Sequence, residues 1–389
     1  RSPSRGLGDV YKRQDLKDLI DKRTEGLMQP RMKERIVKQT KKDFPNGINA
    51  YGTDALRLTF CSLASGGRDI NFDIKRVEGY RNFCNKLWNA SRFINLNIDN
   101  FGISEKRSSS IVDDWIDFKF NETVKKVNKA FEEFRFDLVT KAIYEFIWYE
   151  LCDWFIELNK IDLNQDEITK AEINRSMVDV LEKTLRLAHP IMPFITEDIW
   201  QQLKKYHCSE HESITISAYP SVNNGLSESG YKRIEWLKDV VTGIRNIRGE
   251  LNLKPSTQIS CIFENGTENE KSSLEDVESY VKRLSGLKAI KWADPQDESP
   301  PASIFTRENL KVLIPLEGLI DAEKESERLI KKIAKISKEK DMLASKLSNK
   351  KFTENAPKEL VSSQKERLSV LATELDNLRA QISELNKLI

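Results

Sequence analysis

Residues 79–93, with the sequence GYRNFCNKLWNASRF, place planar amide and guanidinium side chains among aromatic residues. Amide and guanidinium groups hydrogen-bond in one plane, which suits the edges of unpaired RNA bases, and aromatic rings stack on base faces. A solvated face of an ordinary helix has the same composition, and residue types alone leave both interpretations open. The candidates for base recognition are Arg81, Asn85, Lys86, Asn89, Arg92 and Phe93.

A second set of candidates lies in a strongly basic stretch between residues 324 and 351. Such a stripe suits a phosphate backbone, because each cation that neutralises a phosphate releases counterions. The same side chains also solvate a coiled coil, so here too both interpretations stay open. The candidates for backbone contact are Arg328, Lys331, Lys332, Lys335 and Lys338.

Other chemistry is poorly supported by the sequence. The stretch HCSEH, residues 207–211, offers metal-binding residue types without a second pair nearby, so we interpret it as an exposed loop. His189 precedes a proline at a predicted helix end and is interpreted as a packed or capping residue. The glycine pair in ASGGRDI lacks the spacing of a phosphate-binding loop. We therefore assign no catalytic residue and no metal ligand.

Helical periodicity dominates the sequence that must position these candidates. In the predicted helix over residues 73–98, Phe83, Leu87, Ala90 and Ile94 share one face. Thr53 is the predicted N-cap of an earlier helix, and the two prolines in HPIMPF predict that one helix ends there and another begins. Long helices with short connections predict an antiparallel bundle. The other predicted helices cover residues 30–44, 51–65, 113–134, 136–160, 172–206 and 231–251.

The pattern changes after Pro255. The stretches TQISCIF, LKAIKWA and KVLIPL have strand composition, and a short helix separates the first two, which predicts a small α/β module. In the tail, apolar residues from Leu329 and again from Leu368 alternate spacings of three and four, interrupted at NKKFTENAPKE. This pattern predicts a C-terminal antiparallel coiled-coil hairpin. The expected fold class is thus mainly α.

Composition limits the class of protein. The 389 residues are 39% hydrophobic and 32% charged with a net charge of +2, which excludes a disordered polyelectrolyte. No apolar run reaches the roughly 18 residues of a membrane span, so we expect no membrane partner. The five cysteines are scattered, which favours reduced thiols and a cytoplasmic location. Residues 1–14 lack any period, and we interpret them as foreign sequence outside the fold.

Several long stretches carry a family resemblance. They include YGTDALRLTF from Tyr51, LRLAHPIMPFITEDIWQ from Leu185, IRNIRGELNLKP from Ile244 and VLIPLEGLID from Val312. Together they resemble the valyl-tRNA synthetases, which are class I aminoacyl-tRNA synthetases, from about Asp15 to the end of the chain. The resemblance implies a connector that follows the catalytic domain at 15–75, an anticodon-binding helical bundle at 76–255 and a tRNA-binding arm at 319–389. The α/β module occupies 256–318.

The resemblance also implies a function. The intact enzyme would join valine to tRNA(Val) with ATP and Mg²⁺, while this part of it would need no cofactor. The HIGH-like and KMSKS-like motifs of the family and its editing domain do not occur in the sequence. We therefore expect a C-terminal fragment that binds tRNA as a monomer and is inactive in adenylation.

Three alternatives stay open. The isoleucyl and leucyl enzymes share the architecture, although the cysteine-rich zinc module common in the isoleucyl enzyme is not visible here and the basic hairpin is characteristic of the valyl enzyme. A free-standing tRNA-binding module is the second alternative. A structural coiled-coil protein is the third, and it predicts no salt-dependent tRNA binding.

Overall fold

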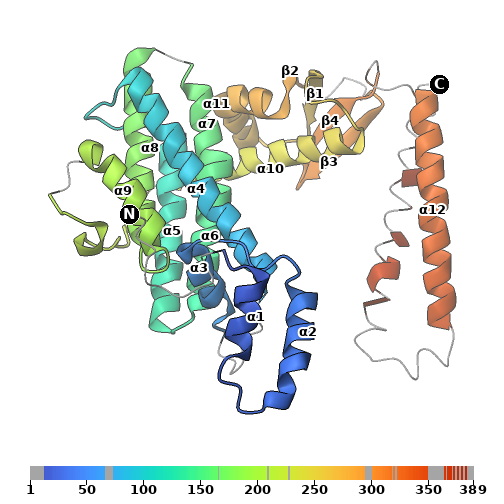
Figure 1. Cartoon of the computed structure of the whole chain (residues 1–389). Coiled ribbons are helices and arrows are strands. Elements are labelled where there is room, and N and C mark those ends of the chain that lie inside the picture. The colour runs from blue at the N-terminus through green and yellow to red at the C-terminus, as the bar shows by residue number, and fades with distance from the viewer. Residues whose placement is uncertain are drawn as a thin grey trace. The chain divides into compact units, whose positions relative to one another are not determined.

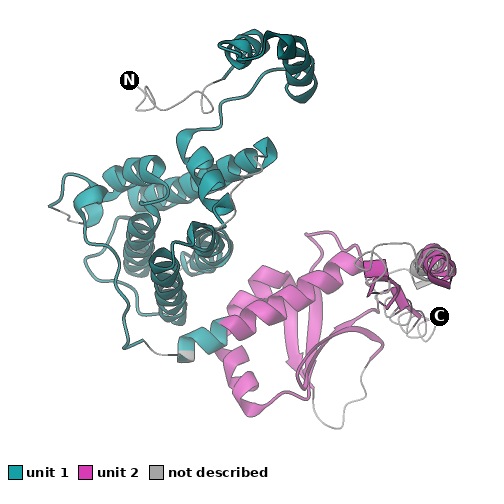
Figure 2. Cartoon of the chain, turned by 90° about the horizontal axis from the view of Figure 1, so that it is seen from below, with its two compact units in different colours: residues 1–234 teal, residues 235–389 magenta. Residues whose placement is uncertain are grey.

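The chain is described here by a computed structural model (Figure 1). The structure describes residues 13–382 except 66–72, 165, 208–209, 227, 294–299, 318, 320–321, 349–362 and scattered positions from 365 onward. These residues divide into two compact units, residues 1–234 and 235–389 (Figure 2). Most of the predicted foreign segment, residues 1–12, lies outside the described residues. Gln14 pairs with Ile48 in an isolated antiparallel β-bridge.

The first unit begins with two short helices that pack together, α1 (Leu16–Thr24) and α2 (Lys33–Asp43), the latter preceded by a 3-10 turn (Pro30–Met32). Helix α3 (Thr53–Leu63) follows. The residue before α3 is Gly52, with a φ of +91°, and it is the N-cap, so the assignment of that role to Thr53 was wrong. A glycine tolerates this backbone conformation without the Cβ clash that a threonine meets.

A helical bundle makes up the rest of this unit, and Figure 1 shows its long helices side by side. Its core contains the apolar face of α4, where Phe83, Leu87 and Ile94 are fully buried as predicted. A capping box between Ser110 and Asp113 fixes the start of α5. The bundle helices are α4 (Ile74–Phe101), α5 (Ile111–Glu132), α6 (Phe136–Glu145), α7 (Ile156–Asp162), α8 (Glu167–Ala188) and α9 (Pro193–His207).

The region predicted as one helix over 136–160 is continuous but not uniform. A π-helical segment, Phe146–Phe155, joins α6 to α7. Its wider turn changes which residues face the core, and Phe146, Leu151 and Phe155 are all buried there. The segment HPIMPF behaves as predicted, because α8 ends at Ala188 and α9 begins at Pro193.

The second unit contains most of α10 (Ser229–Glu250) and a four-stranded sheet in the order β2-β1-β4-β3. Strands β1 (Ile259–Glu264) and β2 (Leu287–Trp292) are parallel and are connected by α11 (Glu268–Ser285). Strands β3 (Ala302–Arg307) and β4 (Leu310–Pro315) form an antiparallel hairpin, and β3 was not predicted. Helix α10 packs closely on β3, since a Cβ at Gly243 would lie 2.4 Å from the ring of Phe305.

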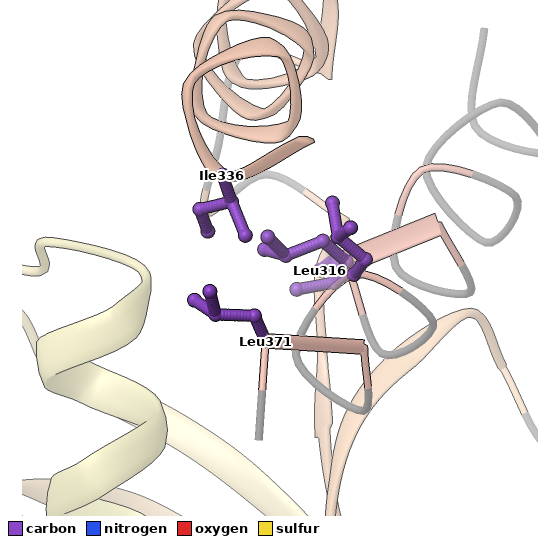
Figure 3. Packing of buried hydrophobic residues seen from close by; sticks show 5 residues of the cluster. Leu316, Ile336 and Leu371 are labelled. Atoms are coloured by element: carbon purple, nitrogen blue, oxygen red, sulfur yellow. The ribbon is translucent and has the colours of Figure 1, made fainter. Parts of the chain in front are cut away.

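The tail begins with α12 (Ala322–Ser348). Leu316, Ile336, Leu371, Leu375 and Leu378 form a buried cluster, and Figure 3 shows Leu316, Ile336 and Leu371 pointing toward one another. Arg367 donates to Glu339 at 2.9 Å. The middle of α12 therefore packs against residues 367–378 of the tail, as in a hairpin. The bundle and the small α/β module of the predicted fold class are confirmed.

Candidate nucleic-acid interface

The exposed face of α4 carries four of the six residues predicted to read bases. They are separated by four, four and three positions, which places them within a sector of about 80° on a helix of 3.6 residues per turn. Within the described part of the chain, none of these four side chains has a hydrogen-bond or ion-pair partner, so their planar groups are open to a ligand. We call this set the α4 row; it consists of Arg81, Asn85, Asn89 and Arg92.

The other two predicted residues are engaged inside the bundle. Lys86 Nζ donates to Asp153 Oδ1 at 2.6 Å and lies 3.8 Å from the centroid of the Trp148 ring. Phe93 is half-buried, and Lys160 Nζ lies 5.0 Å from its ring centroid. One helix face cannot present all six residues, and the structure separates the α4 row from this engaged pair.

An aromatic pocket near the start of α4 was not predicted. Tyr80, Tyr144 and Tyr149 line it together with Arg76 and Lys141, and its volume is about 500 Å³. Tyr149 is 49% exposed, so its ring is accessible to a stacking partner. The exposed ring suits stacking on an unpaired base. Two carboxylates, Asp137 and Glu145, also line the pocket and offset its cations, and Lys141 pairs with Glu145 at 3.9 Å.

The bundle behind α4 is joined to the preceding connector by polar contacts. The buried Asp54 on α3 accepts hydrogen bonds from the backbone N–H of Ile195 at 2.7 Å and of Phe194 at 3.4 Å, at the start of α9. Arg57 donates to the carbonyl oxygens of Pro190 and Ile191, both at 3.0 Å. Burial raises the pKa of Asp54 above its usual value, although the two N–H donors oppose this shift. These contacts fix the position of α9 in the bundle.

His189 is a packed residue, as predicted. Its ring nitrogens lie 2.7 Å from Thr196 Oγ1 and 3.1 Å from Thr215 Oγ1. Burial lowers its pKa below 6.5, because the imidazolium is poorly solvated there. Both nitrogens are occupied by hydroxyl partners, so the residue orders the segment between α8 and α9.

On the arm, three of the predicted backbone-binding residues are exposed on one side of α12. Lys331, Lys335 and Lys338 fall within a sector of about 60°. The packed residues Ile333 and Ile336 lie on the side that meets the rest of the tail. The side chains of Arg328 and Lys332 lie outside the described residues.

The described residues show few features of a catalytic centre. Burial raises the pKa of Cys84, Cys152 and Cys261 to about 12, so these thiols stay protonated near neutral pH. Over the same described residues there is no group of three or more side chains suited to hold a metal ion. None of the described helices has the length and apolar character needed to cross a membrane.

Comparison with known proteins gives two family matches. Residues 113–263 match the anticodon-binding domain of tRNA ligases, and residues 321–386 match the valyl-tRNA synthetase tRNA-binding arm. The first match begins after α4, but α4 packs against α8 and α9 within the matched part. The chain therefore contains both kinds of tRNA-binding region.

Curated relatives match almost the whole chain. A valine–tRNA ligase of Francisella tularensis is 43% identical over 359 residues, covering 91% of this chain and 39% of the relative. One from Psychrobacter arcticus is 40% identical and covers 98% of this chain and 40% of the relative. One from Coxiella burnetii is 40% identical and covers 100% of this chain and 44% of the relative. The chain thus spans about two fifths of the length of these relatives.

Proposed function

We propose, from the premise that this chain belongs to the valyl-tRNA synthetase family and corresponds to its C-terminal tRNA-binding portion, that it binds tRNA(Val) as a monomer. The relatives and the arm match both carry the valyl name, which favours this family over the isoleucyl and leucyl enzymes. The observation that carries the proposal is the α4 row, four exposed planar side chains on the outer face of a bundle of the anticodon-binding type.

In this proposal the α4 row contacts the anticodon stem-loop. Asn85 and Asn89 each offer a donor and an acceptor in one plane, which matches the edge of a base. Arg81 and Arg92 offer planar donors that also stack on bases or pair with phosphates. Phe83, Leu87 and Ile94 on the opposite face of α4 are fully buried in the bundle core. The α4 row is therefore held on a rigid helix, which lowers the entropy cost of binding.

The arm contributes affinity through charge. Lys331, Lys335 and Lys338 contact phosphates on the outer corner of the tRNA in this proposal. Such contacts position the RNA and carry no base information. The expected signature is therefore a strong dependence of affinity on salt concentration with little effect on selectivity.

The chain alone does not activate valine in this proposal. The intact ligase would use ATP and Mg²⁺ to join valine to tRNA(Val) in the cytoplasm, and the HIGH-like and KMSKS-like motifs expected for that step do not occur in this sequence. We expect no valine-dependent ATP–pyrophosphate exchange by the purified chain. A valine-dependent ATP–pyrophosphate exchange activity that copurifies with the chain through repeated chromatography would contradict this part of the proposal.

The experiment that tests the proposal is tRNA binding as a function of potassium concentration. The variant Lys331→Gln/Lys335→Gln/Lys338→Gln removes three exposed charges from the arm. The slope of log affinity against log salt should fall in magnitude by roughly 2–3, at about 0.7–0.9 for each phosphate that the arm no longer neutralises. A matched control, Lys271→Gln/Lys288→Gln/Lys311→Gln, removes three exposed charges from the α/β module and should leave the slope nearly unchanged. Parallel lines for the wild type and the arm variant would show that the arm lysines only solvate a coiled coil.

A further inference from the structure

A cationic pocket in the second unit lies where α10 and α11 both end. Its volume is about 650 Å³. It is lined by residues of the stretch IRNIRGELNLKP, at and after the end of α10, and by residues 283–286 at the end of α11. Four of the lining residues are cations, and no carboxylate lines the pocket among the described residues. The cations are Arg245, Arg248, Lys254 and Arg283.

Arg248 is the central feature of this pocket. It is only 9% exposed, and its guanidinium donates from Nη2 to the carbonyl oxygens of Lys254 at 2.9 Å and Pro255 at 3.4 Å. Its Nη1 is buried with no hydrogen-bond partner among the described residues, and so is Oγ of the buried Ser285. Gly286, in a left-handed conformation with a φ of +65°, leaves room for this guanidinium, since a Cβ there would lie 3.4 Å from Nη1. A buried guanidinium without a carboxylate is costly unless an anion compensates it.

A purely structural role accounts for only part of this charge. Two helices end at the pocket, and each C-terminus carries a partial charge of roughly −0.5, which favours cations nearby. Together they offset about one of the four positive charges. Arg245 fills this role, because it donates to the carbonyl of Leu284 at 3.0 Å near the end of α11. The charges of Arg248, Lys254 and Arg283, which line the same pocket, are not offset by the helix ends.

The place of the pocket within its unit indicates what these charges meet. One stretch of the lining lies between Arg248 and Pro255, and Leu251 within that stretch packs against the buried cluster that includes Ile336 and Leu371 of the arm. The arm is the part of this unit that matches a tRNA-binding arm. We propose that this pocket binds one backbone phosphate of the RNA held by the arm. The exposed Arg283 and Lys254 contact the phosphate oxygens, and Arg248 supplies positive charge beneath them. This inference rests on the proposed tRNA binding and adds a contact site to it.

The test uses the full chain and two exposed positions, so that folding is preserved. In Lys254→Gln/Arg283→Gln the magnitude of the salt slope for tRNA binding should fall by roughly 0.7–0.9, the value for the one phosphate that the pocket no longer neutralises. Affinity near 0.1 M salt should fall several-fold. The control Lys271→Gln/Lys288→Gln removes equal charge from exposed positions outside the pocket lining and should change neither quantity. If the wild-type chain binds tRNA and the pocket variant shows the same slope, the proposal that this pocket binds a phosphate is wrong, and the proposed function is unaffected.

A second measurement separates RNA phosphate from free phosphate. Arginine labelling by phenylglyoxal, followed at Arg283 by mass spectrometry, is carried out with no addition, with tRNA and with millimolar inorganic phosphate. Protection by tRNA, with or without protection by inorganic phosphate, supports the proposal. Protection by inorganic phosphate alone would make this a small-anion site and overturn the RNA assignment. If neither tRNA nor inorganic phosphate protects Arg283 from labelling, the proposal that the pocket binds a phosphate is wrong. Failure of the wild-type chain to bind tRNA in the parallel affinity assay would instead count against the proposed function.

Discussion

The link between α3 and α9 makes a quantitative prediction for Asp54→Ala. The Asp54 carboxylate accepts from the Ile195 N–H at 2.7 Å and from the Phe194 N–H at 3.4 Å, and it is 6% exposed. These donors belong to the first turn of α9, where no intrahelical acceptor exists. Alanine therefore leaves two N–H groups unsatisfied in a place that water reaches poorly.

The expected size follows from the geometry. A hydrogen bond to a charged group contributes about 1.5–3 kcal/mol, and the contact at 3.4 Å is too long to contribute as much as the one at 2.7 Å. Removal of the carboxylate also relieves the burial penalty that raises its pKa. We therefore expect Asp54→Ala to lower the free energy of unfolding by roughly 2 kcal/mol. Asp54→Asn keeps one acceptor without the buried charge and should cost about half as much.

The assay is urea unfolding followed by far-UV circular dichroism, with free energies from linear extrapolation. Asp166→Ala is the matched control, because Asp166 caps α8 from an exposed position through the Thr169 N–H. That change should cost less than Asp54→Ala, because water can replace the lost acceptor at an exposed cap. Hydrogen exchange should show reduced protection at the Ile195 amide in Asp54→Ala only. A cost for Asp54→Ala no greater than for Asp166→Ala would refute the argument that this cap joins two parts of the unit.

Three further predictions concern packing and titration. Lys86→Met should lower the free energy of unfolding by about 1 kcal/mol and change tRNA affinity less than twofold, because Lys86 is held by Asp153; a large loss of affinity with unchanged stability would show that Lys86 meets RNA. The lowered pKa of His189 means that the folded state resists protonation, so wild-type stability should fall as the pH drops below 6.5. His189→Gln should show a weaker fall in urea unfolding between pH 7 and pH 5, and an equal fall would remove His189 as a cause. Gly243→Ala should destabilise the second unit by roughly 1–3 kcal/mol, since the new Cβ would lie 2.4 Å from Phe305; thermal unfolding unchanged from wild type would contradict the close packing of α10 on β3.

Much of the bundle could be predicted from the sequence, because apolar periodicity directly reports a buried helix face. The stripe through Phe83, Leu87 and Ile94 is buried as predicted, and the prolines of HPIMPF mark the junction of α8 and α9. Strand β3 was missed because its sequence, ASIFTR, is short and only weakly alternating. Its strand conformation depends on pairing with β4, which periodicity within one segment does not report.

The candidate site, too, could be predicted only in part from the sequence. Helical spacing predicts which residues share the exposed face of α4, but it does not predict that Lys86 pairs with Asp153, which is 67 positions away in the sequence. The aromatic pocket around Tyr144 was hidden for a similar reason. A tyrosine on a helix has the same spacing whether its ring is in the core or at the edge of it, and only the packing of α4 and α6 decides which.

The measurement that tests the central claim most directly is discrimination between anticodons by the α4 row. Fluorescence anisotropy would compare the affinity of the chain for a tRNA(Val) transcript and for the same transcript with an altered anticodon. We expect the wild type to prefer the valine anticodon by about 1–3 kcal/mol, the range for a well-formed base contact. Asn89→Ala/Arg92→Ala should bind both transcripts with similar, weakened affinity while keeping the circular dichroism spectrum of the wild type. Equal affinities for the two transcripts in the wild type, or undiminished discrimination in the double variant, would contradict the assignment of anticodon recognition to α4.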